Sequence, residues 1–436
     1  MNAHRFRTVL LLAGLCLAGS AQAAVQAGTP AAVVIAVPPL TSPDTGAKGN
    51  EMLSMAWQAT QLIASDLRQT AELMPLTPDR KDYYSYPEVT APTFSKWRDK
   101  GAKALLTGFV QARSDGRLTV GCYVYDAEKG RELGRKGFVV APSDWRRAAH
   151  KCSGLAYQAI TGAPGMFDSR IAYVAESGPP TARVKRIAVM DSDGFNHRYV
   201  TAGDTIVLTP HLSPKANQLA YVSFVGGTPQ IRVLNLESKE QHPLVPNGTM
   251  SFAPRYSPDG SKIVFSMMLG PNSDIYVVGA NGGFAQRLTT APGTDTDASF
   301  SPDGSKIVFE SDRSGTQQLY VMDANGANER RISFGSGWYA APEWSPDGEW
   351  IAFTRRGAGA RQIGIIKPDG SGEKVLTTGP ADDSPSWAAS SREILFERND
   401  ASGRPGLYRL TLDGSEPRKM TIPQDGSDPD WSPTID

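Results

Sequence analysis

The nine-residue stretch SPDGSKIVF occurs twice in the chain, at 257–265 and at 301–309, and looser copies lie at the same spacing on both sides. An apolar or aromatic residue followed by Ser-Pro, or by a degenerate form of it, recurs at intervals of 44, 44, 44, 43 and 44 residues. These positions are Leu212, Tyr256, Phe300, Trp344, Trp387 and Trp431. A repeat of this length indicates a series of similar structural units.

Each unit contains several short strand signals. A strand such as IVFE (307–310) follows the Ser-Pro turn, a second strand such as LYVMDANGA (319–327) comes next, and a short segment such as RLTT (287–290) closes the unit. Pro-Asp-Gly is typical of tight turns, because Pro presets φ and Gly accepts a positive φ. About four short strands per unit, at a period of roughly 40–50 residues, are typical of a β-propeller blade.

The repeat predicts six blades. The strand that follows each Ser-Pro turn begins, in successive units, at Ile171, Leu219, Ile263, Ile307, Ile351 and Ile394. The first of these has no aromatic-Ser-Pro stretch before it, whereas the stretch at Trp431 has no strand after it. We therefore expect the C-terminal strand through Trp431 to enter the first blade and close the ring, which removes exposed sheet edges.

Residues 24–163 do not repeat, and their pattern predicts a small α/β domain before a propeller at 164–436. We expect strands over 31–40 and 102–112, a hairpin over 117–126 and 131–141, and helices over 50–74 and 143–161, the second capped by Ser143. In the first helix, Met52, Ala56, Ala59, Ile63 and Leu67 share one face.

Residues 1–23 have the layout of a secretory signal peptide: basic residues, an apolar run, and small residues at Ala21 and Ala23. Cleavage after Ala23 would export a soluble protein, since no later segment is long and apolar enough to span a bilayer. In an oxidising compartment, Cys122 and Cys152 would either form a disulfide or remain as two buried thiols.

Charge and motifs exclude several classes of function. Lys+Arg and Asp+Glu number 45 each, which argues against a nucleic-acid binder and against a polybasic membrane anchor. Propellers also gate serine peptidases, but the chain contains no G-x-S-x-G. His150, His197, His211 and His242 have no nucleophile motif beside them. We therefore expect a protein that is not an enzyme and requires no cofactor.

The order of parts and the repeat WSPDGxxIxF…IYVxDxxG…LT resemble the TolB family, periplasmic components of the Tol-Pal system of Gram-negative bacteria, over essentially the whole chain. The resemblance implies a periplasmic adaptor that supports outer-membrane integrity and cell division. It implies binding of the lipoprotein Pal at one propeller mouth, which bacteriocin translocation segments also exploit. It further implies binding of TolA by the mature N-terminus: Ala24, Val25, Gln26, Ala27 and Gly28.

The resemblance places the Pal-binding rim in the segments that lead into each aromatic-Ser-Pro stretch, which we interpret as connections on the face opposite the SPDG turns. Thr296 matches a Pal-contacting threonine of the family, and Met250 falls where some relatives carry histidine. Trp338 and Tyr339 are candidate interface anchors. The expected rim comprises Met250, Ser251, Thr296, Asp297, Trp338, Tyr339, Asp382, Asp383 and Asp428.

Aspartates gather in the same segments, and three interpretations stay open. They could hold Ca²⁺, with Asp295, Asp297 and Asp383 as candidate ligands, they could attract a basic partner, or they could be solvated turn residues. We expect Trp344, Trp387 and Trp431 to pack the blades together. The alternative function is a small-ligand-binding propeller, which an apolar or aromatic-lined pocket would favour.

Overall fold

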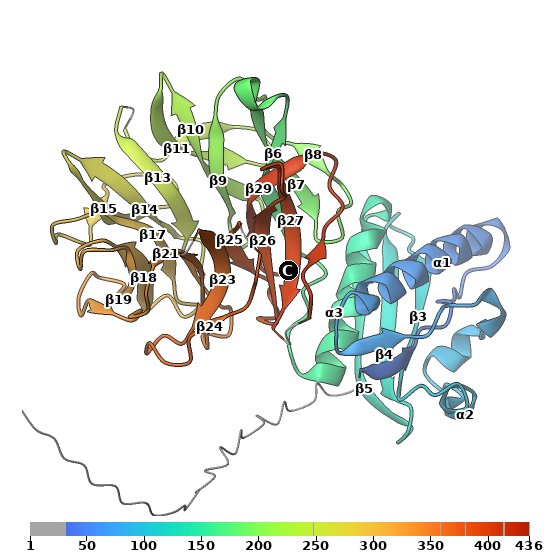
Figure 1. Ribbon diagram of the computed structural model, residues 1–436. Helices are drawn as coiled ribbons and strands as arrows, with labels where there is room; N and C mark the ends of the chain where they lie inside the picture. The colour runs from blue at the N-terminus through green and yellow to red at the C-terminus, as the bar shows by residue number, and fades with distance from the viewer. Residues whose placement is uncertain (1–31, 247, 358, 380, 413–414, 436) are drawn as a thin grey trace, which may run out of the picture. The chain divides into compact units, whose positions relative to one another are not determined.

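A computed structural model describes residues 32–246, 248–357, 359–379, 381–412 and 415–435 (Figure 1). The expected signal peptide and the expected TolA-binding residues Ala24–Gly28 lie outside the described residues. Among the described helices, none is long and apolar enough to cross a membrane.

The N-terminal part is a five-stranded sheet with helices packed on it (Figure 1). Its strands, in spatial order, are β2 (Leu73–Pro75), β1 (Val33–Ala36), β3 (Ala104–Ala112), β4 (Leu118–Asp126) and β5 (Arg131–Val140). The helices are α1 (Gly46–Arg68), α2 (Phe94–Arg98) and α3 (Trp145–Thr161), with short 3₁₀ turns at Arg80–Asp82, Tyr86–Val89 and Pro142–Asp144. β1 pairs in parallel with β2 and β3, whereas β3, β4 and β5 are antiparallel.

The first helix follows its apolar pattern. Met52, Ala56, Ala59, Ile63 and Leu67 are all buried, as their spacing predicted. The helix nevertheless ends at Arg68 rather than at residue 74, because Leu73–Pro75 leaves it and joins the sheet as β2.

The expected cap of the second long helix was wrong. A 3₁₀ turn occupies Pro142–Asp144, so α3 begins at Trp145, and no side-chain hydrogen bond caps it. Ser143 instead contacts Asp144 through its hydroxyl.

A disulfide joins β4 to α3. Cys122 and Cys152 are both fully buried, their Cα atoms lie 5.9 Å apart, and they form the bridge. Of the two alternatives for these cysteines, the disulfide is confirmed. It closes a loop of 30 residues across the sheet–helix interface.

The rest of the chain forms six antiparallel sheets of four strands, the six expected blades. The first blade consists of β29 (Asp425–Trp431), β6 (Arg170–Ser177), β7 (Val184–Asp191) and β8 (Arg198–Tyr199), with a 3₁₀ turn at Pro180–Ala182. The second consists of β9 (Val207–Leu212), β10 (Gln218–Val225), β11 (Thr228–Asn235) and β12 (Gln241–Pro243). The third consists of β13 (Met250–Tyr256), β14 (Lys262–Leu269), β15 (Asn272–Gly279) and β16 (Gln286–Arg287).

The last three blades repeat this plan. The fourth consists of β17 (Asp295–Phe300), β18 (Lys306–Ser311), β19 (Gln318–Asp323) and β20 (Arg330–Arg331). The fifth consists of β21 (Trp338–Trp344), β22 (Ile351–Gly357), β23 (Ala360–Ile366) and β24 (Lys374–Val375). The sixth consists of β25 (Asp382–Trp387), β26 (Glu393–Asn399), β27 (Pro405–Thr411) and β28 (Arg418–Lys419).

The ring closes through the C-terminal strand, as the sequence predicted. β29 pairs with β6, so that Trp431 faces Ile171 and Asp425 faces Glu176 across the ladder. The first blade is thus assembled from the two ends of the repeat region, and β6 gains a partner on the channel side.

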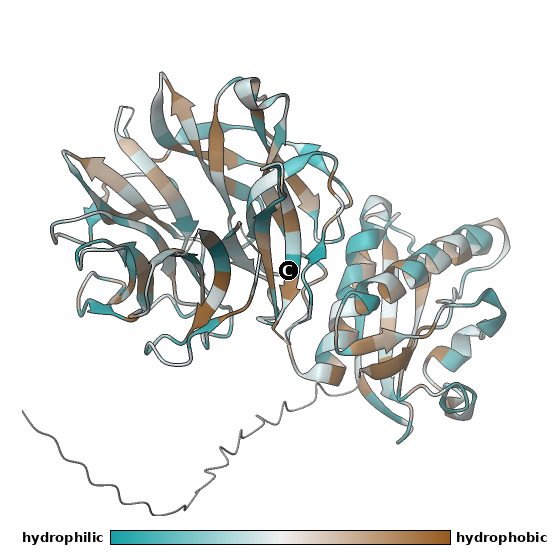
Figure 2. Ribbon diagram, viewed as in Figure 1, coloured by the Kyte–Doolittle hydropathy of each residue, from teal (hydrophilic) through white to brown (hydrophobic). Residues whose placement is uncertain are grey.

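Apolar residues concentrate along the strands, where the blades face one another (Figure 2). The aromatic residues Phe265, Phe309, Phe353 and Phe396, one from each of four consecutive blades, are completely buried. Trp344, Trp387 and Trp431 are also buried, which confirms their expected role in blade packing. The core of the propeller is therefore a set of similar interfaces between successive sheets.

Candidate functional site

The first strand of each blade lines the central channel. Each of these six strands contacts the equivalent strand of the next blade, which closes an inner ring. They are β9, β13, β17, β21, β25 and β29. The segments interpreted from the sequence as connections beside the channel, such as 249–256 and 338–344, are these strands themselves, which corrects that expectation.

Every channel strand contains a β-bulge at the same position. The bulged residues have left-handed backbone with φ between 43° and 53°, although none of them is glycine. They are Thr209, Ala253, Asp297, Ala341, Ser384 and Asp428. The pairing register shifts at each of these positions. Left-handed backbone at non-glycine residues is unfavourable, so surrounding contacts must hold it in place.

A polar side chain from the preceding blade supplies such a contact in five blades, and in the second blade the bulge N–H of Thr209 donates to Asp428 at 3.3 Å. The bulge N–H groups of Asp297, Ala341, Ser384 and Asp428 donate at 3.2–3.4 Å. Their acceptors occupy one repeat position: Ser266, Glu310, Thr354 and Glu397. This position is the last letter of IVFS, IVFE, IAFT and ILFE. The polar residue at the end of an otherwise apolar strand therefore fixes the bulge of the next blade.

The bulge level of the channel is acidic. Burial and the neighbouring carboxylate of Asp297 raise the pKa of Glu310 to about 8. Burial, together with Asp428 and Asp383, raises the pKa of Glu397 to about 7. Burial likewise raises the pKa of Asp297 and of Asp428. The ionisation of Glu310 and Glu397 therefore depends on pH near neutrality.

The expected rim residues fall into two groups, and the first group is accessible. Met250 and Trp338 begin β13 and β21, and their exposed fractions are 38% and 53%. Asp297 and Asp428 are partly exposed in the channel. Thr296 does not belong to this accessible group, because it is only 6% exposed and donates a hydrogen bond to Glu310 at 2.5 Å.

The second group is buried, which corrects its expected place on the rim. Tyr339 is 0% exposed, packs on Phe353, and donates its hydroxyl hydrogen bond to Glu373 at 2.7 Å. Ser251 is also 0% exposed and accepts the N–H of Ile231. Asp382 is buried and forms a bidentate ion pair with Arg398. Successive strand residues point to opposite faces, so Tyr339 turns inward where Trp338 turns outward.

The expected calcium ligands are not brought together. Asp295 is buried against Arg313 at 2.7 Å, and Asp383 is held by Arg361 at 2.7 Å and Arg356 at 3.1 Å. Within the described ranges, no group of three or more His, Cys, Asp or Glu side chains is arranged to hold a metal ion. Arginine side chains thus already neutralise Asp295 and Asp383, and the calcium site at Asp295, Asp297 and Asp383 stays a prediction.

A second polar level crosses the channel two residues beyond each bulge. It consists of the residue before each aromatic or apolar position of the repeat, and we call it the polar ring. Its members are His211, Arg255, Ser299, Glu343, Ser386 and Asp430. Five of them accept the backbone N–H of the next blade's aromatic or apolar residue, at 2.8–3.4 Å. Arg255, which has no acceptor atom, is the exception.

The polar ring contains two carboxylates, Glu343 and Asp430, and one cation, Arg255. Arg255 forms an ion pair with Glu343 at 2.5 Å. Burial lowers the pKa of His211 well below its usual value, so this imidazole is neutral. Burial raises the pKa of Asp430 to about 7, with Glu343 contributing.

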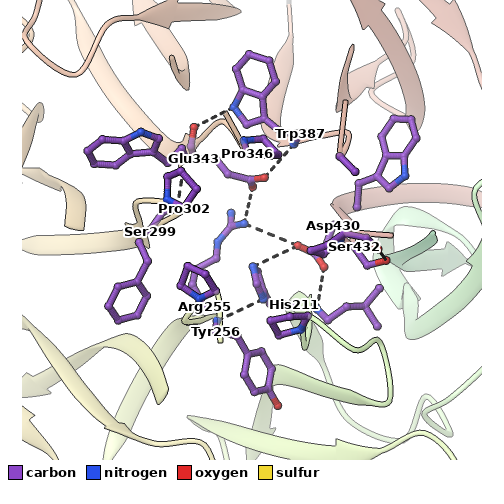
Figure 3. A pocket seen from close by; sticks show the side chains of 18 of the residues that line it. His211, Arg255, Tyr256, Ser299, Pro302, Glu343, Pro346, Trp387, Asp430 and Ser432 are labelled. Atoms are coloured by element: carbon purple, nitrogen blue, oxygen red, sulfur yellow. Dashed lines mark hydrogen bonds and ion pairs between the residues drawn. The ribbon is translucent and has the colours of Figure 1, made fainter. Parts of the chain in front are cut away.

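An apolar cavity of about 330 Å³ lies against the polar ring, on the side of the Ser-Pro turns (Figure 3). We call it the proline pocket. Five prolines of the repeat line it: Pro214, Pro258, Pro302, Pro346 and Pro433. Aromatic lining comes from Tyr256, Phe300, Trp344, Trp387 and Trp431. The spacing of the repeat could have indicated this pocket, since the proline and aromatic positions, each filled in five of the six blades, must converge on the ring axis.

The fold and the channel define a six-bladed β-propeller protein with an N-terminal α/β domain. Residues 157–435 match the TolB β-propeller domain, and residues 22–133 match the TolB amino-terminal domain. Because the propeller match covers more than half of the chain, the chain belongs to the TolB family.

Individual relatives agree with this assignment. The chain is 49% identical over 181 residues to the Tol-Pal system protein TolB of Zymomonas mobilis, over 42% of this chain and 40% of that protein. It is 48% identical over 226 residues to that of Rhizorhabdus wittichii, over 50% and 52%. The chain thus spans about half the length of these curated relatives, or less. The crystal structure of TolB from Acinetobacter baumannii is 27% identical with a TM-score of 0.77, over 92% of this chain and 97% of that one.

Proposed function

We propose that the protein is a non-catalytic periplasmic adaptor of the Tol-Pal system, exported by its N-terminal signal peptide. It binds Pal at the end of the propeller channel where the channel strands begin, and TolA through Ala24–Gly28. In this role it supports outer-membrane integrity and cell division, and bacteriocin translocation segments use the same surface. Membership of the TolB family supports the proposal.

The observation that carries the Pal site is the exposure of large apolar side chains at the start of two channel strands. Met250 pairs across the ladder with Met268, which is also exposed, and Leu269 follows it. Trp338 begins the channel strand two blades further on. Trp and Met are enriched at protein interfaces, because their side chains bury a large apolar area on binding.

The acidic level of the channel supports a partner that presents cations or hydrogen-bond donors. Asp297 and Asp428 are the partly exposed carboxylates of this level. They would steer a basic or donor-rich surface toward the channel, and would affect the association rate more than the final affinity.

Calorimetric titration of the mature protein with the soluble domain of its own organism's Pal tests this proposal. We expect Trp338→Ala to weaken binding at least tenfold, or about 1.4 kcal/mol. The matched control is Phe284→Ala, which removes an exposed aromatic side chain from the turn between β15 and β16 and should bind Pal normally. Absence of Pal binding to the folded protein would overturn the proposal.

A parallel titration tests the N-terminal site. Removal of residues 24–28 should abolish binding to the soluble part of TolA while Pal binding persists. Undiminished TolA binding by the shortened chain would show that TolA contacts another surface.

A further inference from the structure

The proline pocket combines apolar walls with a charged floor, and the proposed adaptor function does not use it. Its walls come from equivalent positions of the repeat, and its floor is the polar ring. In Figure 3, Asp430 faces both Arg255 and His211 at this floor, and Pro302, Pro346 and Trp387 are among the residues around them. The pocket is thus an apolar chamber that ends in a charged group.

The walls present apolar surface rather than polar atoms. Each of the three indole N–H groups is already occupied: Trp344 donates to Gly348 at 3.2 Å, Trp387 to the carbonyl of Glu343 at 3.0 Å, and Trp431 to Ser169 at 2.8 Å. The rings therefore offer only carbon surface to the cavity. Four of the prolines, Pro258, Pro302, Pro346 and Pro433, are exposed around it.

The floor contains one carboxylate oxygen without a close partner. Asp430 is only 3% exposed, and its Oδ2 accepts the N–H of Leu212 at 2.8 Å. Among the described residues, the contacts of its Oδ1 are long: His211 Nε2 lies at 3.5 Å and Arg255 at 3.8 Å. Buried carboxylate oxygens normally receive hydrogen bonds, so this oxygen is free to accept one from a ligand.

Charge selects the type of ligand. Arg255 is neutralised by Glu343 at 2.5 Å, and His211 is neutral, so above the Asp430 pKa of about 7 the carboxylate of Asp430 is the uncompensated charge at the floor. An anionic ligand would meet this charge without a free cation to bind it. An ammonium group would donate to Oδ1, and aromatic walls also favour cations.

We propose that the proline pocket binds small organic amines, with the ammonium group on Asp430 Oδ1 and an aromatic or alicyclic body between the prolines and the indole rings. A volume of about 330 Å³ is at the lower end of the range for small-molecule sites, which suits a compact ligand. This site lies beyond the polar ring from the proposed Pal surface and does not depend on that function.

The test uses 2-phenylethylammonium as the probe, in a ligand-observed NMR titration of the mature protein at pH 8. We expect saturable binding with a Kd of about 1 mM, which is reasonable for so small a ligand. 3-Phenylpropionate has a similar body and the opposite charge, and should bind at least tenfold more weakly. 2-Phenylethanol, the neutral analogue, separates the contribution of charge from that of the apolar body.

Asp430→Asn retains an oxygen for the N–H of Leu212 and removes the charge. It should weaken the amine at least tenfold and leave the affinity for 2-phenylethanol unchanged. The matched control is Glu397→Gln, which neutralises a buried carboxylate at the bulge level and should leave amine affinity within twofold of the original.

A second variant does not touch the polar ring. Ala389 occupies the repeat position that is proline in the other five aromatic-Ser-Pro turns, and it lines the pocket. Ala389→Phe should fill the pocket and weaken the amine and the alcohol alike. The proposal is overturned if the folded protein shows no saturable amine binding, or if Asp430→Asn and Ala389→Phe both bind the amine normally.

Discussion

The side chain of Glu310 connects two adjacent blades and also has a shifted pKa. Its two carboxylate oxygens accept from the Thr296 hydroxyl at 2.5 Å and from the bulge N–H of Ala341 at 3.2 Å, so it ties two adjacent blades together. The same burial that allows these bonds raises its pKa to about 8. Between its usual pKa of 4.5 and about 8, the folded protein retains a proton that the unfolded chain releases.

The stability of the protein should therefore fall as pH rises through this window, and Glu310→Gln should reduce the fall. At pH 5 the variant should be less stable by about 1 kcal/mol, because glutamine has only one oxygen for the hydrogen bonds that Thr296, Gln317 and Ala341 donate. By pH 9 the difference should shrink or reverse, because the variant has no buried charge. Urea unfolding at several pH values measures this change.

Glu349→Gln, at an exposed position of a Ser-Pro turn, is the control and should show the pH dependence of the original protein. A difference between Glu310→Gln and the original protein that stays constant from pH 5 to pH 9 would contradict the assigned pKa.

Single residues also explain where sequence reasoning failed on the rim. Trp338 and Tyr339 are neighbours with similar side chains, yet one is 53% exposed and the other is 0% exposed. In a connection both could face solvent, whereas in a strand they must point to opposite sides. The error followed from interpreting the segment as a connection, and the alternation of β21 resolves it.

At the scale of elements, the strands and helices were largely predictable, because their signals are local. The turn residues, the alternating strands and the apolar face of the first helix each depend on a short window of sequence. The repeated bulge was not foreseen. Its signal is the polar residue that ends IVFS, IVFE, IAFT and ILFE, and this residue acts on the next blade rather than on its own strand.

The disulfide is the strongest testable link between two elements. Cys122→Ala with Cys152→Ala removes the bridge between β4 and α3 and should lower the free energy of unfolding by about 3–4 kcal/mol, given the closed loop of 30 residues. Denaturant unfolding with and without reductant measures the loss.

Reductant should destabilise the original protein and leave the double variant unaffected. Equal sensitivity of the two proteins to reductant would contradict a structural role of the bridge.

At the scale of the whole molecule, ring closure by β29 joins residues far apart in the sequence, such as Ile171 and Trp431, which are 260 positions apart. This strand also supplies Asp428 to the bulge level and Asp430 to the polar ring. The end of the chain therefore contributes to both the closure of the fold and the chemistry of the channel.

Deletion of residues 425–436 should abolish the closed propeller, because β6 would expose an unpaired edge to the channel. We expect aggregation, or loss of a single cooperative unfolding transition, measured by size-exclusion chromatography and thermal unfolding. Deletion of 434–436 alone is the control, since it leaves all of β29 in place. A monomeric, cooperatively unfolding product of the longer deletion would show that closure is dispensable.

The sequence by itself determined the number of blades, the closing strand and the α/β elements, because the 44-residue period and the turn residues can be read directly from the sequence. Only the tertiary structure decided which side chains of the channel strands are exposed to solvent, which form ion pairs with arginine, and which contact one another. The physical reason is that each bulge changes the direction in which the neighbouring side chains point. In addition, these side chains meet partners that come from different blades. Asp383 with Arg361 and Asp430 beside His211 are pairs that no local pattern specifies.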